Sequence, residues 1–238
     1  MMRRRHKRLA TTITVAVAIV AVAVTIATTG GNTSHDGSNT RADVTGKTST
    51  TSTPASTTST VPVGALPQTE AMPSATSPQF LTNMQALWSG ITKNSAVLAQ
   101  PAFFPEGAYL QVKTLPADAV DYQERLVGQY ALDIGAAHSL LGSDAPTATF
   151  VSVIIPSGNV HWVTPNSCQN QIGYYEVGNA RLVYNAGGAT QSIGIASMIS
   201  WRGQWYVVHF GAYNRTTDVG MVLDPEEGDG TSTPASLC

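Results

Sequence analysis

Cysteine and histidine can form a catalytic pair, and Cys168 and His161 lie close enough in the sequence to do so. Cys168 lies in the segment PNSCQNQIGYY, and His161 precedes it by seven residues. A nucleophilic cysteine needs a neighbouring base that generates the thiolate, and this separation allows the two side chains to meet across a hairpin. No sequence signature of a cysteine peptidase or transpeptidase surrounds Cys168. The pair is therefore a candidate for catalysis that no specific motif supports.

Asp133 is a second candidate, because it interrupts the apolar face of a predicted helix. The pattern of residues 118–142 repeats apolar side chains at spacings of three, four and seven. At 100° per residue, Asp133 falls between Tyr122 and Leu126 on this face. A carboxylate there serves either as a base, with a pKa set by burial, or as the structural partner of a buried Arg, Tyr or backbone amide. Both alternatives stay open.

Histidines and aromatic residues of the C-terminal half form a third group of candidates. By alternation, His209 shares a strand face with Trp205, and such residues either line a ligand groove or fill the core. The candidates for ligand contact are His209, Trp162, Tyr174 and Trp205. No H-x-H, HExxH or CxxC spacing occurs, and the glycines of NAGGAT fall in a hairpin. Neither a metal site nor a cofactor is therefore expected.

The first part of the folded region, residues 79–142, is predicted to be mainly helical. Apolar residues have helical spacing over residues 79–99, and residues 118–142 form the clearest helix. Between them, prolines interrupt residues 101–116, which we expect to be a loop with a short extended or helical piece at 109–114. Asp118 is expected to cap this helix and Gly142 to end it. Asp121 and Arg125 are expected to form a weak surface pair on its flank.

From residue 147 onward the apolar period changes to two. The predicted strands are TATFVSVII, NVHWV, IGYYEV, ARLVY, QSIGIASMISW and QWYVVHFGAY. Turn sequences of a few residues separate them, which favours antiparallel hairpins over crossover connections. Helices followed by a meandering sheet indicate an α+β domain over residues 79–223, with N-terminal helices packed on a curved antiparallel sheet.

The N-terminal part predicts a membrane anchor and a stalk. Residues 1–9 are basic, and residues 10–28 carry no charge. As a helix, about 19 residues span about 28 Å, close to the thickness of the bilayer core. We expect an uncleaved transmembrane anchor with the basic end in the cytoplasm, or a secreted protein if the segment is a cleaved signal sequence. Residues 29–78 are rich in Ser, Thr and Pro and are expected to form a disordered stalk.

Charge is concentrated at the two ends of the chain. The net charge is −2, with RRRHKR near the N-terminus and DPEEGDG at the start of an acidic tail, residues 224–238. The region between them has no basic stripe, so nucleic-acid binding is not expected.

The second cysteine, Cys238, gives Cys168 another possible role. Thiols outside the cytoplasm tend to be oxidised, and an even number of cysteines suits pairing. Closing a loop of about 70 residues stabilises a fold by about 4 kcal/mol in the chain-entropy account. We expect a Cys168–Cys238 disulfide that holds the acidic tail on the domain. A buried, inert Cys168 and an intermolecular bridge are the alternatives.

The order of anchor, polar stalk, helices and curved sheet resembles the membrane-anchored members of the nuclear transport factor 2-like superfamily, such as the Mce-associated proteins. The hairpin IASMISWRGQWYVVHFG is similar to the last two strands of that cone-shaped fold. FFPEGAYLQVK and NQIGYYEVGNARLVY are similar to stretches of actinobacterial membrane-anchored, extracytoplasmic proteins. The resemblance implies a pocket between sheet and helices, in which some enzymes of the superfamily use a carboxylate as base.

Two functions are consistent with these features. The first is a non-catalytic, membrane-tethered extracytoplasmic domain of a bacterial cell envelope that binds another envelope protein or a small ligand. The second is an envelope enzyme that uses Asp133 or the Cys168/His161 pair. The stalk favours the first, because tethering raises the effective concentration of a domain near its partners.

Overall fold

The computed structural model describes residues 61–215 and 218–234. The predicted basic segment, the anchor at residues 10–28 and most of the predicted stalk lie outside the described residues. Within the described ranges, no helix is both long enough and apolar enough to cross a membrane.

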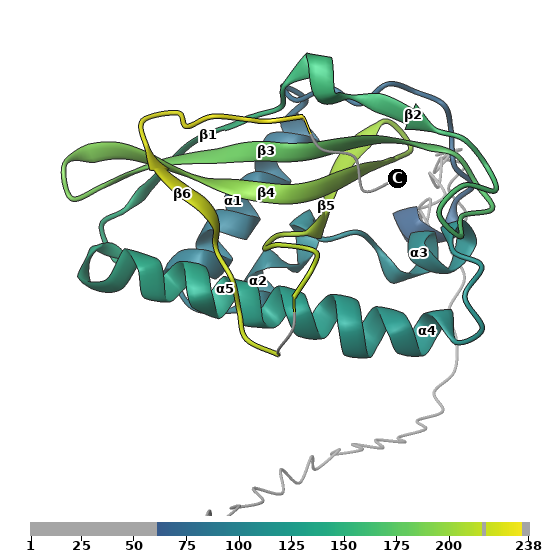
Figure 1. The fold of residues 1–238 in the computed structure, drawn as a ribbon, viewed down its shortest axis with the longest axis horizontal. Helices are drawn as coiled ribbons and strands as arrows, with labels where there is room; N and C mark the ends of the chain where they lie inside the picture. The colour runs from purple at the N-terminus through teal and green to yellow at the C-terminus, as the bar shows by residue number, and fades with distance from the viewer. Residues whose placement is uncertain (1–60, 216–217, 235–238) are drawn as a thin grey trace, which may run out of the picture. The chain divides into compact units, whose positions relative to one another are not determined.

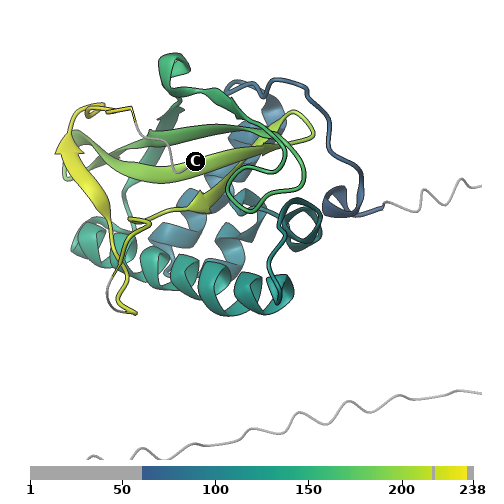
Figure 2. The same cartoon turned by 45° about the vertical axis from the view of Figure 1, so that its right-hand side comes forward.

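The described chain is an α+β domain with an antiparallel sheet, as predicted (Figure 1). The helices are α1 (Pro78–Thr92), α2 (Ala96–Ala99), α3 (Glu106–Val112), α4 (Asp118–Asp121) and α5 (Gly128–Leu141). The strands are β1 (Thr149–Ile154), β2 (His161–Val163), β3 (Tyr174–Ala186), β4 (Ala189–Trp201), β5 (Gln204–His209) and β6 (Leu223–Glu227). Figure 2 shows that the helices lie on one side of the sheet.

The predicted helix of residues 118–142 is present but is not a uniform α-helix. A π-helical turn, η3 (Tyr122–Val127), joins α4 to α5. Gly142 ends the helix with a positive φ of 52°, as predicted. Asp118 does not cap the start: the N-cap is Ala117, and the Asp118 carboxylate accepts a hydrogen bond from the Ala119 N–H.

The sheet is built around the long hairpin of β3 and β4, with strand order β1-β3-β4-β5. β2 pairs with the N-terminal end of β3, and β6 pairs with β4 beside Gln191–Gly194. The two strands predicted at residues 172–177 and 180–184 are one strand, because pairing with β4 continues from Gly178 to Ala180. Asn179 takes a φ of 54°, which asparagine tolerates, so the chain continues where a turn was expected.

The core fills the space between the helices and the inner face of the sheet. Trp88 of α1 packs on Tyr184 of β3 with ring centroids 5.0 Å apart, and Phe103 stacks on Tyr130 of α5 at 4.2 Å. Trp205 is 1% exposed and belongs to this core. The aromatic side chains of the sheet are thus mostly structural.

Residues 61–77 fall within the predicted stalk, yet they lie against the domain. The Trp201 indole N–H donates to the carbonyl of Val63 at 3.0 Å, and the Gln68 amide donates to the carbonyl of Ser200 at 2.9 Å. The predicted stalk therefore ends too late in the sequence. Residues 61–77 form hydrogen bonds with the domain, and composition alone does not reveal such partners.

The start of the predicted acidic tail is also part of the fold, since β6 pairs with β4. Arg181 of β3 is 2% exposed; it donates to Ser192 Oγ at 2.8 Å and lies 3.4 Å from a carboxylate oxygen of Glu226. The folded domain therefore continues beyond residue 223. Backbone pairing and one buried cation hold an acidic strand that has little apolar surface of its own.

Gly230 allows the chain after β6 to close over Arg181. A Cβ at Gly230 would lie 2.4 Å from Arg181 Nη2 and from Ser192 Oγ, and its φ is 70°. We expect Gly230→Ala to lower the free energy of unfolding by about 2 to 4 kcal/mol, from backbone strain plus overpacking. Urea unfolding measures the change, and hydrogen exchange of residues 228–234 reports loosening of the segment.

Gly228→Ala is the matched control for this prediction. Gly228 has a similar φ of 65°, but a Cβ at this position would have nothing within 4 Å. This variant should show only the strain of about 1 to 2 kcal/mol. Equal losses in the two variants would contradict a close contact with Arg181.

Candidate functional site

A cavity of about 220 Å³ opens between the start of the long helix and one end of the sheet. α3, α4 and η3 form one wall, β3, β4 and β5 form the floor, and the loop containing Cys168 forms the other wall. Both polar and apolar side chains line it. The polar ones are Tyr109, Lys113, Asp121, Arg125, Gln169, Tyr174, Glu176, Ser197, His209 and Tyr213.

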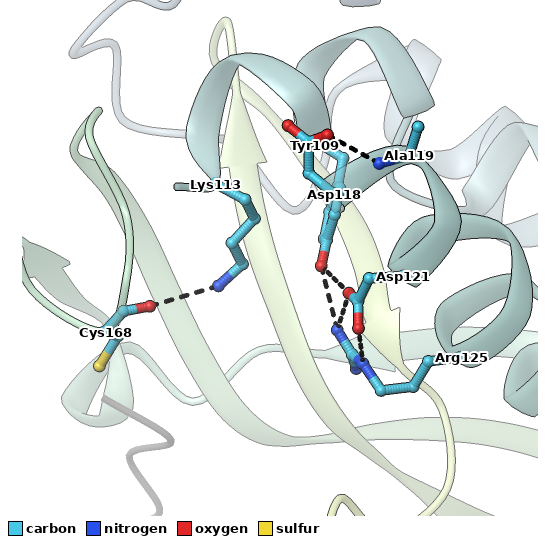
Figure 3. A network of polar contacts seen from close by, with 7 residues as sticks. All are labelled: Tyr109, Lys113, Asp118, Ala119, Asp121, Arg125 and Cys168. Carbon is cyan, nitrogen blue, oxygen red and sulfur yellow. Dashed lines mark hydrogen bonds and ion pairs between the residues drawn. The ribbon is translucent and has the colours of Figure 1, made fainter. Parts of the chain in front are cut away.

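On the helical wall, Tyr109, Asp121 and Arg125 form a closed network (Figure 3). Arg125 donates to both carboxylate oxygens of Asp121, at 2.7 and 2.6 Å, and to the Tyr109 hydroxyl at 3.0 Å. The Tyr109 hydroxyl in turn donates to Asp121. The Arg125 hydrogen bonds hold the pKa of Asp121 below its usual value, and burial raises that of Tyr109.

This network corrects the prediction of a weak surface pair. The Asp121 and Arg125 side chains are only 24% and 35% exposed, and both line the cavity. The i,i+4 spacing indicated the pairing itself. It did not indicate that Tyr109, from a segment predicted mainly as a loop, would cover the pair.

On the floor of the cavity, Glu176 is 2% exposed. The Ser197 hydroxyl donates to one carboxylate oxygen of Glu176 at 3.4 Å, and His161 Nε2 lies 3.4 Å from the other. A carboxylate in this position was not among the residues singled out from sequence. Alternation along β3 was the available signal, because Glu176 occupies an inward position of a strand that is otherwise mostly apolar.

His209, at the end of β5, is 8% exposed and lines the cavity. Its ring meets the ring of Tyr213 edge-on, with centroids 4.9 Å apart. No hydrogen bond from another described residue reaches the His209 ring. Burial, reinforced by Arg125, Arg215 and Lys113 and opposed by Asp121, lowers the pKa of His209 to about 3. The imidazole is therefore neutral at physiological pH, with one donor and one acceptor nitrogen.

The low pKa of His209 predicts a loss of stability in acid. A free histidine titrates near 6.5, so between about pH 6.5 and pH 3 the unfolded chain binds more protons than the folded chain. Stability should fall as the pH is lowered through this window, by at most about 1.4 kcal/mol per pH unit from this group. Urea unfolding between neutral and mildly acidic pH measures the slope, which His209→Gln should reduce. Equal slopes in the two proteins would contradict the assignment.

The loop that carries Cys168 is strained where it borders the cavity. Cys168 and Gln169 both have positive φ values, 49° and 58°, which are uncommon for residues other than glycine. Backbone hydrogen bonds hold the loop against α3: Thr114 N–H donates to Gln169 O at 2.9 Å, and Gln171 N–H donates to Val112 O at 2.8 Å. The tertiary structure thus imposes a costly conformation here.

Two further irregularities border the same cavity. The π-helical turn η3 contains Arg125, and a β-bulge interrupts β5 opposite Ser197, since Ser197 faces His209 while the next residue of β4 faces Val207. The extra residue of the bulge, Val208, lines the cavity. π-turns and bulges recur next to functional sites, because they re-aim side chains at some cost in regular hydrogen bonding.

Of the predicted catalytic pair, Cys168 is in the cavity lining and His161 is not. Cys168 is on the cavity wall, and its carbonyl accepts a long hydrogen bond of 3.5 Å from the Lys113 ammonium (Figure 3). His161 lies beside Glu176. The described residues contain no free cysteine, whereas a nucleophile requires a free thiol. Cys238 lies outside the described residues, so its disulfide with Cys168 stays a prediction.

Asp133 lies away from the cavity lining and is fully engaged. Its carboxylate accepts hydrogen bonds from Arg215, at 2.7 and 3.0 Å, and from the N–H groups of Gly211 and Met221, at 2.9 and 2.8 Å. Both charged side chains are at most 5% exposed. This arrangement matches the structural alternative for a buried carboxylate: Asp133 ties the segment after β5 to α5.

Of the four predicted ligand-contact residues, two line the cavity and two do not. Tyr174 and His209 line the cavity, and Asn170 donates to the Tyr174 hydroxyl at 2.7 Å. Trp205 is in the core, and Trp162 packs edge-on against Tyr175 on the neighbouring strand. Across residues 61–215 and 218–234, no three His, Cys, Asp or Glu side chains cluster so as to hold a metal ion.

Comparisons with known proteins add no assignment. No family model, no curated protein and no solved structure shows significant similarity to the chain.

Proposed function

We propose that the described domain binds a small ligand in the cavity between η3 and the sheet, and that it does so without catalysis. One observation carries this function: four locally unfavourable features meet around one cavity. They are the π-helical turn, the β-bulge at Val208, the positive φ values at Cys168 and Gln169, and the buried polar groups of the floor. Such features are retained where function requires them.

The protonation states of the lining residues favour binding over proton transfer. A general acid or base works best with a pKa near the working pH. The pKa of His209 is about 3, that of Asp121 is lowered, and that of Tyr109 is raised, so all three are shifted away from neutrality. Burial lowers the pKa of Lys113 towards neutrality, which makes Lys113 the residue at which a catalytic role would be tested first.

The location and the partners are part of the same proposal. The basic cluster, the apolar segment at residues 10–28 and the polar stretch that follows support a single-pass membrane protein with this domain outside the cytoplasm. Membership of the nuclear transport factor 2-like superfamily, and a role in binding or assembly in a bacterial cell envelope, are proposed on the sequence resemblance. Protease protection of the chain in intact cells and in spheroplasts tests the orientation.

Binding itself is tested by filling the cavity. Val208 is half-buried and lines the cavity, so Val208→Phe should occupy part of the volume. We expect small molecules that bind the full chain in a ligand-observed NMR screen to lose at least about tenfold in affinity in this variant. Lys93→Ala, at an exposed position on the far end of α1, is the control. Ligands that bind the Val208→Phe variant unchanged would place binding elsewhere and overturn the assignment of this cavity.

A further inference from the structure

We infer that the ligand of this cavity is an uncharged polyol of about one ring, such as a single sugar residue or an inositol; this inference rests on the proposed binding function. The charges of the lining residues, their hydrogen-bonding types and the cavity size all point to this class.

The charges around the cavity balance. Asp121 and Arg125 neutralise one another through a bidentate pair, and the remaining lining charges are one carboxylate, Glu176, and one ammonium, Lys113. His209 is neutral. A ligand with a net charge would bring an uncompensated charge into a partly enclosed site, which is costly. A neutral ligand avoids this penalty.

The hydrogen-bonding groups match hydroxyls. The lining contains donors (Arg125), acceptors (Asp121) and groups that do both (Ser197 and neutral His209). A hydroxyl both donates and accepts hydrogen bonds at a single oxygen atom. A polyol can therefore form hydrogen bonds with both the donors and the acceptors of the lining in several orientations. Amide ligands, by contrast, carry their donor and their acceptor on different atoms, so they fit this mixed set in fewer orientations.

The apolar part of the lining suits the carbon skeleton of a ring. Phe104, Val112, Ile199 and Val208 interrupt the polar groups, so that a ligand meets both kinds of surface. The volume of about 220 Å³ lies below the range of about 300–1,000 Å³ that holds drug-sized molecules. One ring with its hydroxyls is therefore the appropriate size.

Saturation-transfer NMR on the full chain in detergent tests the inference with four solute classes. They are neutral polyols (glucose, N-acetylglucosamine, myo-inositol), zwitterions (glycine, alanine), anions (acetate, phosphate) and a cation (choline). We expect one or more polyols to bind, with an affinity that changes little with salt because no charge is neutralised. We expect His209→Phe to weaken binding at least about tenfold, while His209→Gln, which restores a donor and an acceptor, retains most of it.

The outcomes separate the two proposals. If a charged or zwitterionic solute binds wild type but not Val208→Phe, and no polyol binds, the polyol inference fails and the binding function stands. If polyols bind wild type and Val208→Phe equally, they bind outside the cavity; if they bind wild type and His209→Phe equally, His209 does not hold them. The inference fails in either case. If no solute of any class binds, the proposed binding function fails with it. Urea unfolding of each variant shows whether a loss of binding reflects a loss of fold.

Discussion

Asp133→Asn is expected to lower the free energy of unfolding by about 3–5 kcal/mol, the range seen when one partner of a buried ion pair is removed. Arg215 would then remain buried without its counter-ion, because its side chain is only 5% exposed. The N–H groups of Gly211 and Met221 would also lose a charged acceptor. Urea unfolding of wild type and variant measures the difference directly.

Two comparisons make this prediction specific. Asp118→Asn is the matched control, since the carboxylate of Asp118 accepts a single exposed hydrogen bond, and a change within about 0.5 kcal/mol is expected. In the double variant Asp133→Leu with Arg215→Met, both charges are removed, so the loss should be smaller than that of Asp133→Asn alone. A single variant within about 1 kcal/mol of wild type would show that the pair does not anchor the segment after β5.

Reduction of the predicted Cys168–Cys238 disulfide is expected to cost about 4 kcal/mol of stability. The physical reason is that the cross-link removes conformations from the unfolded chain by closing a loop of about 70 residues. Urea unfolding with and without reductant measures the effect. Thiol titration of the denatured, unreduced protein should detect no free thiol, and titration after reduction should detect two.

Cys238→Ser separates this effect from general sensitivity to reductant. The variant should have the stability of the reduced wild type, and reductant should not destabilise it further. Two free thiols in the unreduced wild type would exclude the intramolecular bridge. A covalent dimer would instead identify the intermolecular alternative.

Local patterns predicted the parts of the fold that depend on neighbouring residues. The helix of residues 118–142 follows from apolar spacing and ends at Gly142 as expected. The antiparallel sheet follows from alternation and short connections. β6 and residues 61–77 were not predicted, because their stability comes from pairing with distant segments and from Arg181 and Trp201, not from their own composition.

In the candidate site, too, sequence identified the residues marked by local patterns but not those whose burial depends on distant segments. Sequence singled out His209 and Tyr174, which line the cavity, because strand alternation marks inward positions. Sequence treated Asp121 and Arg125 as a surface pair, and it left Asp133 open between a base and the structural partner of a buried group. Burial depends on what packs over a helix, and a helical wheel contains no information on that partner.

By itself, the sequence determined the helix-then-sheet order, the α+β class and an inward-facing Asp133, since each depends on residues a few positions apart. Only the tertiary structure decided which polar groups share a cavity: it brought Tyr109 to Asp121 and Arg125, and set this network across from Glu176 and His209. Contacts of that kind join segments tens of residues apart. They depend on how whole elements pack, which the local periodicity of a chain does not specify.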